Sequence, residues 1–362
     1  MAVRILHAAD FHMDSPFGAL PEEKAAERRR EQRELLNALA DRAEEERADI
    51  VLLAGDLFDS DVAYWETQET LLGALAAIRA QVFIAPGNHD YYCAKSPYAF
   101  LSFPDNVHLF TTAAIRGVEL PELGCRVFGA GFNASLCRPI LPGFTAPDDG
   151  MINLMVLHGE MGGDKYAPLT EEDIAASGLD YLALGHVHAF SGIRKAGRTF
   201  WAYPGCIEGR GFDETGDKGV IAGTVDKGSC ALRFVPMGGR RYHIEEVDMS
   251  GEQDALAALR RRAAGHERDI VRFILTGAWA GKADVGALTA ALQDSFYSVS
   301  VKDRTVPTRD IWAGCGEDSL TGLFLARMRE RYDAGDEADK ALTEQAVRYA
   351  LAALEGREGA DV

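Results

Sequence analysis

The amino-acid sequence predicts an α/β protein: a layered β-sandwich core flanked by helices, then a smaller α/β domain and C-terminal helices. Three observations predict this fold class. Five apolar runs, rich in Val, Ile and Leu, each end in polar residues, and helical patterns separate the first three runs. After residue 240 the pattern changes to shorter strands and helices. A length of 362 residues is also natural for more than one domain.

The five apolar runs are predicted to be strands of the core. They are RILHAAD (4–10), DIVLLAGD (49–56), VFIAPGNHD (82–90), INLMVLHGE (152–160) and YLALGHVH (181–188). Continuous runs of this kind are typical of strands buried on both faces. If the strands lie with the same ends together, their terminal polar side chains meet at one edge, where open α/β sheets bind ligands.

The remaining elements follow from periodicity and from turn residues. Residues 22–47 and 64–80 have helical patterns, residues 104–150 are broken by proline and glycine into short strands, and residues 219–236 form a hairpin. Beyond these we expect strands at 242–248, 269–276 and 296–302, with helices at 252–264, 282–293, 317–331 and 335–355.

The polar ends of the runs supply metal-binding groups. They contain carboxylates, an amide and imidazoles but no thiolate, a set that suits divalent ions such as Mn²⁺, Fe²⁺ or Zn²⁺. Five of the nine histidines of the chain lie in these short segments. Each segment alone is a weak signal that a turn or a strand cap explains equally well, whereas five in order are specific.

In this order, DxH, GDxxD, GNHD, a lone histidine and GHxH resemble the motifs of the calcineurin-like metallophosphoesterase superfamily. The segments HAADFHMDSPF, LLAGDLFD and YPGCIEGRGFDETGDKG are similar to those of bacterial DNA-repair exonucleases of the SbcD and YhaO type. The resemblance covers roughly residues 3–235. Beyond residue 240 it is one of general plan only.

The resemblance implies a site for two divalent metal ions, with manganese preferred and iron or zinc as alternatives. One ion would be bound by Asp10, His12 and His188, the other by Asn88, His158 and His186, and Asp56 would bridge them. Two ions about 3.5–4 Å apart can clamp the attacking and leaving oxygens of a phosphoester and activate a water. A bridging carboxylate offsets the repulsion between the two dications.

Further residues have implied roles around the ions. His89 is not expected to bind metal; its counterpart in the family supports the transition state and protonates the leaving oxygen. Asp59 and Asp90 are candidates for orienting ligand imidazoles. Arg210 could contact substrate phosphate, although a structural salt bridge is an equal alternative.

Outside the motifs the sequence supports plainer interpretations. His7, His108, His243 and His266 lack a ligand-like context and are interpreted as surface or core histidines. Glu160 either supports the site or only belongs to a loop. The three arginines at 28–30 favour a solvated helix face over a DNA-binding patch, because acidic residues interleave with them. The six cysteines show no metal-binding spacing and are interpreted as reduced.

Three functions remain open on the sequence. The first is a DNA exo- and endonuclease subunit for double-strand-break repair. Its binding to DNA would depend largely on a partner, an SMC-type coiled-coil ATPase similar to SbcC. The second is a stand-alone phosphodiesterase or phosphatase acting on small nucleotides or phosphoproteins, and the third a non-enzymatic scaffold. The net charge of −18 is unusual for a free-standing duplex binder, which favours a partner. The scaffold is disfavoured because every expected ligand is present.

The resemblance also divides the chain. We expect a catalytic domain at 1–238, an α/β capping domain at 239–306 and a helical, partner-docking segment at 307–362. A homodimer is a further expectation. The sequence shows neither a targeting segment nor an apolar run long enough to span a membrane, so we expect a cytoplasmic protein.

Overall fold

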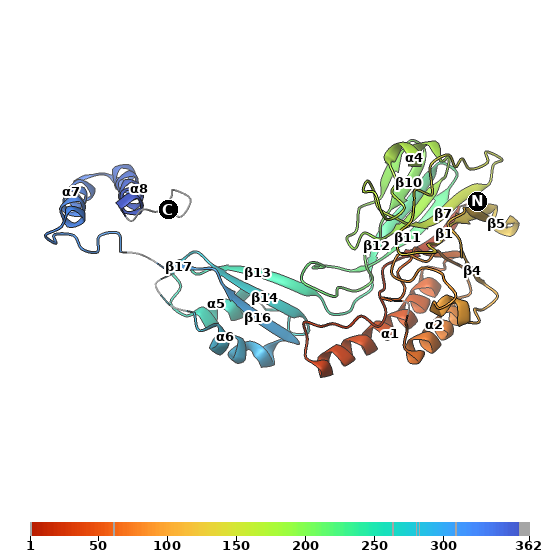
Figure 1. The fold of residues 1–362 in the computed structure, drawn as a ribbon, viewed down its shortest axis with the longest axis horizontal. Helices are drawn as coiled ribbons and strands as arrows, with labels where there is room; N and C mark the ends of the chain where they lie inside the picture. The colour runs from red at the N-terminus through yellow and green to blue at the C-terminus, as the bar shows by residue number, and fades with distance from the viewer. Residues whose placement is uncertain are drawn as a thin grey trace. The chain divides into compact units, whose positions relative to one another are not determined.

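The computed structural model describes residues 2–60, 62–262, 264–279, 281, 283–307 and 310–354 (Figure 1). Two compact units are present. The first comprises Met1–Ile244, His266–Arg272 and Phe296–Ser298, and the second comprises Glu245–Gly265, Phe273–Ser295 and Val299–Val362. The division into three domains at residues 238/239 and 306/307 stays a prediction.

A six-stranded sheet in the first unit carries three of the five predicted motifs. Its order is β12-β11-β1-β2-β3-β4, with β1 Val3–Ala8, β2 Ile50–Leu53, β3 Gln81–Ile84, β4 Val107–Leu109, β11 Gly219–Asp226 and β12 Ser229–Pro236. Strands β1 to β4 are parallel, and the β11–β12 hairpin adds antiparallel to β1. The motifs that follow β1, β2 and β3 therefore lie at the same edge of the sheet.

A second six-stranded sheet carries the other two motifs. Its order is β5-β6-β7-β8-β10-β9, with β5 Arg116–Leu120, β6 Cys125–Gly129, β7 Ile152–His158, β8 Tyr181–Gly185, β9 Arg194–Ala196 and β10 Thr199–Ala202. Strands β6, β7, β8 and β10 are parallel, and the edge strands β5 and β9 are antiparallel to their neighbours. His158 ends β7 and is paired with Gly185 at the end of β8. The two motifs of this sheet therefore also share an edge.

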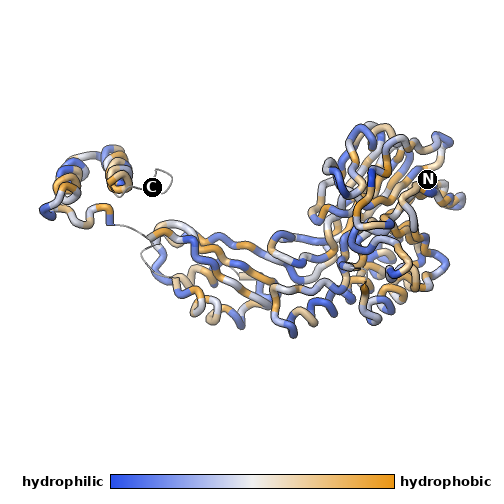
Figure 2. Tube along the Cα trace, in the orientation of Figure 1, coloured by the Kyte–Doolittle hydropathy of each residue, from blue (hydrophilic) through white to orange (hydrophobic). Residues whose placement is uncertain are grey.

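The two sheets pack face to face, as the predicted sandwich requires. One apolar cluster joins Ile5, Ile50 and Phe83 of the first sheet to Leu154 and Tyr181 of the second. Figure 2 shows hydrophobic stretches of the tube running through this unit. Because both faces of each central strand are buried, the runs are continuous rather than alternating.

Helices cover the outer faces of the sandwich. Helices α1 (Glu22–Glu45) and α2 (Trp65–Ala77) share a core with the first sheet, and α4 (Glu171–Ala176) shares one with the second. The short α3 (Pro97–Phe100) precedes β4, and the 3-10 turn η1 (Pro121–Leu123) links β5 to β6. The predicted helices at 22–47 and 64–80 are thus confirmed. Helix α4 and the strands β9 and β10 were not predicted.

One feature of α1 corrects the interpretation of its arginines. Arg28 is fully buried, and its guanidinium lies 2.6 Å from the carboxylate of Glu208, which is also buried. Only Arg30 of the three arginines is exposed. The interpretation of the run as a solvated face was therefore wrong for Arg28, because its partner is distant in the sequence.

The rest of the chain forms small sheets and helices close to the predicted positions. A three-stranded sheet has the order β13-β14-β16, and β15 pairs with β17. The bounds are β13 Tyr242–Asp248, α5 Ala255–Arg262, β14 Ile270–Thr276, β15 Ala278–Trp279, α6 Val285–Leu292, η2 Gln293–Ser295, β16 Ser298–Asp303 and β17 Val306–Pro307.

Two C-terminal helices, α7 (Leu320–Ala334) and α8 (Glu337–Leu354), pack on each other around a small core of Ile311, Leu325 and Val347. The side chain of Ser319 accepts a hydrogen bond from the backbone N–H of Gly322, which caps the start of α7. Within the described residues, no helix has the length and apolar character to cross a membrane.

Candidate metal centre

The loops after β1, β2 and β8 have unusual backbone conformations at residues of the two ligand groups. Asp10, His12, Asp56 and His186 all have positive φ angles, of 53°, 45°, 50° and 107°. Such angles are rare for residues other than glycine, and they cluster at functional sites where surrounding structure holds them in place. At Gly87 the reason for glycine is direct, since a Cβ atom there would collide with the Asp56 carboxylate. The backbone thus gives up local stability to position these groups.

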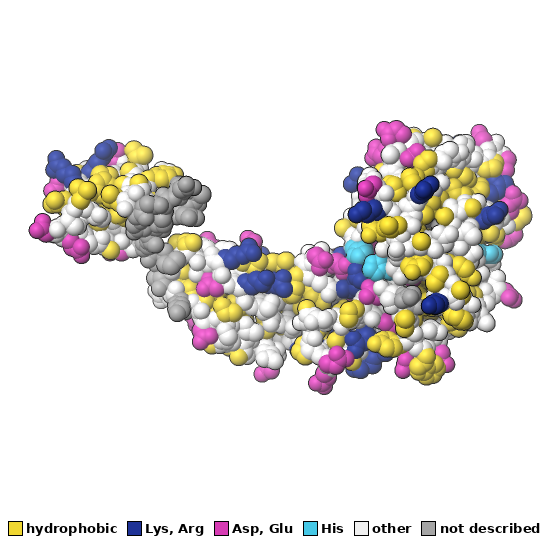
Figure 3. All heavy atoms as spheres, in the orientation of Figure 1, with side chains coloured by type: hydrophobic (Ala, Val, Ile, Leu, Met, Phe, Trp, Pro, Cys, Tyr) yellow, Lys and Arg dark blue, Asp and Glu magenta, His cyan; other side chains and the backbone are white. Residues whose placement is uncertain are grey.

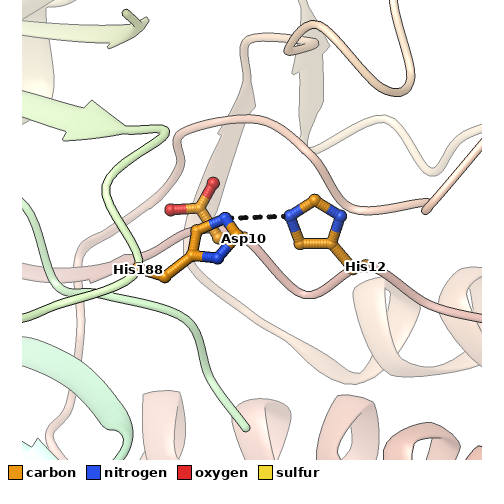
Figure 4. A group of neighbouring side chains, drawn as sticks. All are labelled: Asp10, His12 and His188. Carbon is orange, nitrogen blue, oxygen red and sulfur yellow. Dashed lines mark hydrogen bonds between the residues drawn. The ribbon is translucent and has the colours of Figure 1, made fainter. Parts of the chain in front are cut away.

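The first group of ligand-type side chains is Asp10, His12 and His188 (Figure 4). The Nε2 atoms of His12 and His188 face each other at 3.2 Å, and the carboxylate of Asp10 lies beside them. The backbone N–H of His186 donates to both carboxylate oxygens of Asp10, at 3.0 and 3.1 Å. This network fixes the Asp10 carboxylate.

The second group is formed by Asn88, His158 and His186. The amide oxygen of Asn88 lies 2.9 Å from His158 Nε2 and 3.0 Å from His186 Nδ1, and the two ring nitrogens are 3.3 Å apart. His158 Nδ1 donates to the backbone oxygen of Ala54 at 3.0 Å. That bond leaves Nε2 of His158, which points at the group, with its lone pair available to a metal.

Asp56 lies between the two groups. Its Oδ2 atom is 3.7 Å from His12 Nε2 of the first group and 3.4 Å from His158 Nε2 of the second. Its Oδ1 atom accepts a hydrogen bond of 2.9 Å from the backbone N–H of His89. This is the position that a ligand shared by two ions requires.

The electrostatics of the site favour bound cations. Burial, and next the charge of Asp56, raise the pKa of Asp10 well above its ordinary value. Burial lowers the pKa of His12 and of His186 to about 4, so both imidazoles are neutral near pH 7. Two buried carboxylates among neutral imidazoles and an amide oxygen form a donor set that fits divalent ions.

The side chains around these groups hold them in place. Asp59 accepts from His12 Nδ1 at 3.0 Å, which is the orienting contact predicted from the sequence. His188 Nδ1 donates at 2.6 Å to Glu214, a buried residue that was not predicted. Its signal in the sequence was the segment GFDETGDKG, in which no residue had been assigned a role.

Arg210 joins the two orienting carboxylates. Its guanidinium lies 3.0 Å from Asp59 and 3.0 Å from Glu214. Burial alone would raise the pKa of Glu214, but the hydrogen bonds from His188 and Arg210 outweigh it and lower that pKa far below its ordinary value. The salt bridge expected as one alternative for Arg210 is thus present, and its contact with substrate phosphate stays a prediction.

Asp90 differs from its predicted role. Its carboxylate accepts hydrogen bonds from the backbone N–H groups of Leu57 at 2.7 Å and Gly87 at 2.7 Å, and from the hydroxyl of Tyr98. Its hydrogen-bond partners are thus backbone groups and a phenol, not an imidazole. Asp90 is buried and ties the loop after β2 to the loop after β3. It therefore shapes the site through the backbone.

His89 is exposed at the mouth of the site, and histidine side chains are visible on the surface of this unit in Figure 3. Its ring meets His12 edge-on at a centroid distance of 4.7 Å. Its Nδ1 atom lies 3.0 Å from the backbone oxygen of Asp59, and one of its ring nitrogens lies within 4.8 Å of ligand atoms of His12 and Asp56. This position suits a group that transfers a proton to or from a bound substrate.

Other residues singled out in the sequence lie in plainer surroundings. His7 is buried against the hydroxyl of Tyr181, and His108 stacks on Phe83, as expected of core histidines. Glu160 accepts three backbone N–H bonds from residues 164–166, so it holds its own loop. His243 and His266, in contrast, lie together, with ring centroids 4.0 Å apart.

Comparison with known proteins agrees with this geometry. The calcineurin-like phosphoesterase family matches residues 3–190. A metallophosphoesterase of Bacillus subtilis, YhaO, is 29% identical over 364 residues, covering 92% of this chain and 88% of its own length. The DNA double-strand break repair protein Mre11 of Methanopyrus kandleri is 23% identical over 278 residues, covering 69% of this chain and 60% of its own length.

Proposed function

The chain belongs to the calcineurin-like phosphoesterase family, and from this premise we propose that it is a nuclease subunit that hydrolyses DNA phosphodiester bonds with two divalent ions. Manganese is the proposed metal, with iron or zinc as alternatives. The observation that carries the proposal is the group of seven ligand-type side chains at the ends of five strands, with Asp56 between its two halves.

The proposed roles follow from the contacts of each residue. Asp10, His12 and His188 would hold one ion, Asn88, His158 and His186 the other, and Asp56 both. The ions, when bound, would supply Lewis acidity that activates a water and offsets the charge of the phosphate. The imidazole of His89, an exposed residue, would deliver a proton to the leaving oxygen. Arg210 and the two carboxylates it joins would keep the imidazoles of His12 and His188 oriented.

Two observations favour DNA in an assembly over a small substrate alone. One is the similarity to Mre11, whose name assigns it to DNA double-strand break repair. The other is the C-terminal helix pair, where Leu320, Leu323, Leu342, Tyr349 and Leu354 are each more than half exposed. Apolar side chains gathered on two helices are typical of a surface that a partner covers. We propose that this partner is an SMC-type ATPase that resembles SbcC.

The net charge bears on the same choice. At −18, the isolated chain repels duplex DNA at long range, and acidic side chains are spread over the face in Figure 3. Near physiological salt, where the Debye length is about 8 Å, only short contacts remain effective. Cleavage of long DNA should therefore be weak alone and rise when a partner supplies basic groups.

The test is one assay series with the purified chain and Mn²⁺. Its substrates are duplex, single-stranded and hairpin DNA and a small chromogenic phosphodiester, each with and without the ATPase. We expect cleavage of the small diester in both conditions and strong cleavage of DNA only with the partner. High turnover of nucleotides with indifference to the partner would instead identify a stand-alone phosphodiesterase. Tight, partner-free binding to duplex DNA at about 150 mM salt would contradict the electrostatic argument.

A further inference from the structure

A second cluster of metal-binding side chains lies in elements that contribute nothing to the candidate metal centre. His243 is on β13, and His266 and Asp269 come from the segment just before β14. Asp269 Oδ2 lies 2.9 Å from His243 Nε2 and 3.6 Å from His266 Nδ1. All three residues belong to the first compact unit. No local sequence pattern indicates this pairing, because the two histidines are 23 positions apart.

The backbone holds this cluster in a defined shape. The N–H of Ile270 donates to the oxygen of Arg241 at 2.9 Å, which aligns the start of β14 with β13. The N–H of Asp269 donates to the oxygen of His266 at 3.0 Å and closes a tight turn. The N–H of Arg241 donates to Asp269 Oδ1 at 3.0 Å. One carboxylate oxygen of Asp269 is thus used by the backbone, and the other is presented to the two imidazoles.

Two of the three separations between the ligand atoms are close to those around a tetrahedral ion. Zinc–nitrogen and zinc–oxygen bonds of about 2.0–2.1 Å place neighbouring ligands roughly 3.4 Å apart. The separations of 2.9 and 3.6 Å from Asp269 Oδ2 lie on either side of that value. The side chains of His243, Asp269 and His266 are only 16%, 15% and 29% exposed, so the ligand atoms are partly shielded from water.

The chemistry of the side chains also favours an ion. The two rings are tilted by 33° with centroids 4.0 Å apart, and both imidazoles lie beside the same carboxylate. Neutral imidazoles with one carboxylate are a common donor set for zinc. Glu245, two residues after His243 on the same strand, is already paired with Arg262 at 2.7 Å.

We propose that His243, His266 and Asp269 bind one divalent transition-metal ion, best matched by Zn²⁺, separate from the ions of the catalytic centre. The ion joins the start of β13 to the turn before β14, and water takes the fourth position. Because three protein ligands from two segments bind the same ion, the ion connects these segments and stabilises the sheet.

The experiment counts bound zinc. The full-length chain is stripped with a chelator, loaded with Zn²⁺, dialysed and subjected to elemental analysis together with His266→Gln and His108→Gln. His108 is the matched control, since it is bonded to Gln81 rather than to a possible ligand cluster. We expect His266→Gln to hold one equivalent less than the unmodified chain, and His108→Gln to hold the same amount. Phosphodiesterase activity should be unchanged in both.

A second arm keeps the result independent of the catalytic centre and of the folding of one variant. In an Asp56→Ala background, which weakens the catalytic centre, one zinc equivalent should remain and should disappear on adding Asp269→Asn. Equal zinc contents with and without the His266 and Asp269 substitutions, in proteins with unchanged circular dichroism, would overturn the proposal. The cluster would then be an aspartate hydrogen-bonded to a histidine pair. If one of the two variants, at His266 or at Asp269, does not fold, the zinc content of the other variant decides the test.

Discussion

The metal centre and the C-terminal helix pair violate the usual distribution of polar and apolar side chains in opposite directions. In the metal centre, Asp10 and Asp56 are 0% and 1% exposed. In the helix pair, Leu320 and Leu323 are 77% and 63% exposed. Burying carboxylates costs free energy unless each has partners, and here each has several. Exposed leucines cost less, but on two adjacent helices they indicate a surface that is covered in the functional state.

The two regions differ in the part of the proposed function that each one supports. The centre is complete within one chain, because its hydrogen bonds connect residues of one compact unit. Among the described residues, the core cluster of the helix pair is small, with Ile311, Leu325 and Val347 buried, while several leucines of the same helices stay exposed. We therefore expect hydrolysis to depend on the metal centre alone. The access of substrate should depend on the helix pair. Substitutions in the two regions can break this separation.

The largest effect is expected for Asp56→Ala. This change removes the carboxylate that lies between the two ligand groups, so the catalytic ions should be lost and hydrolysis of a small diester should fall to background. Elemental analysis of manganese and a diester assay measure the two results. Asp217→Ala, at a half-exposed carboxylate that pairs with Arg241, is the control and should change neither. Full manganese occupancy in Asp56→Ala would remove Asp56 from the ligand set.

His89→Ala should separate metal binding from catalysis. His89 contacts the site through its ring edge and its backbone, so both ions should stay bound, while loss of a positioned proton donor slows hydrolysis by about 10²–10⁴-fold. Manganese content and kcat on the same preparation test this. A variant that loses its metal would make His89 a ligand, and one of normal rate would leave it without a catalytic role.

Glu214→Gln should weaken metal binding without removing it. The variant loses the charge that orients His188, and changes of this kind lower metal affinity by about 10–100-fold. Activity at saturating Mn²⁺ should be nearly retained. Titration of activity against Mn²⁺ gives the affinity, and an unchanged midpoint would mean that Arg210 and the backbone suffice to hold His188.

The same substitution has a pH signature in the metal-free chain. The pKa of Glu214 is lowered on folding from its ordinary value of 4.5, so its ionised form stabilises the folded protein. This contribution is complete above about pH 4.5 and is lost as the pH falls toward the lower pKa of the folded state. The stability difference between the unmodified chain and Glu214→Gln should therefore be largest near neutral pH and shrink below pH 4.5. Chemical unfolding at several pH values measures it.

The sequence predicted most of the centre because each ligand lies in a short segment at the end of a strand. The strands are apolar on both faces, so their ends could be located and their ligands grouped. The contacts that the sequence did not predict join segments that are distant in the chain. Glu214 reaches His188 across 26 positions, Asp90 reaches the backbone of Leu57 across 33, and Arg28 reaches Glu208 from α1. No local pattern carries such pairings.

The smallest effect on chemistry is expected for the double substitution Leu320→Lys and Leu323→Lys. Both side chains are largely exposed, so the free energy of unfolding should change by no more than about 0.5 kcal/mol and diester hydrolysis should be unaffected. Binding of the proposed ATPase partner should be lost, since two charges would have to be buried in an apolar interface. Leu325→Lys is the contrasting control, because Leu325 is 1% exposed in the core of the pair and its loss should unfold the two helices.

Co-purification with the ATPase, thermal unfolding and the diester assay separate these outcomes. If the exposed pair can be charged with no loss of binding, the partner docks elsewhere; if diester hydrolysis also falls, the two regions are coupled and the division of labour between them is wrong.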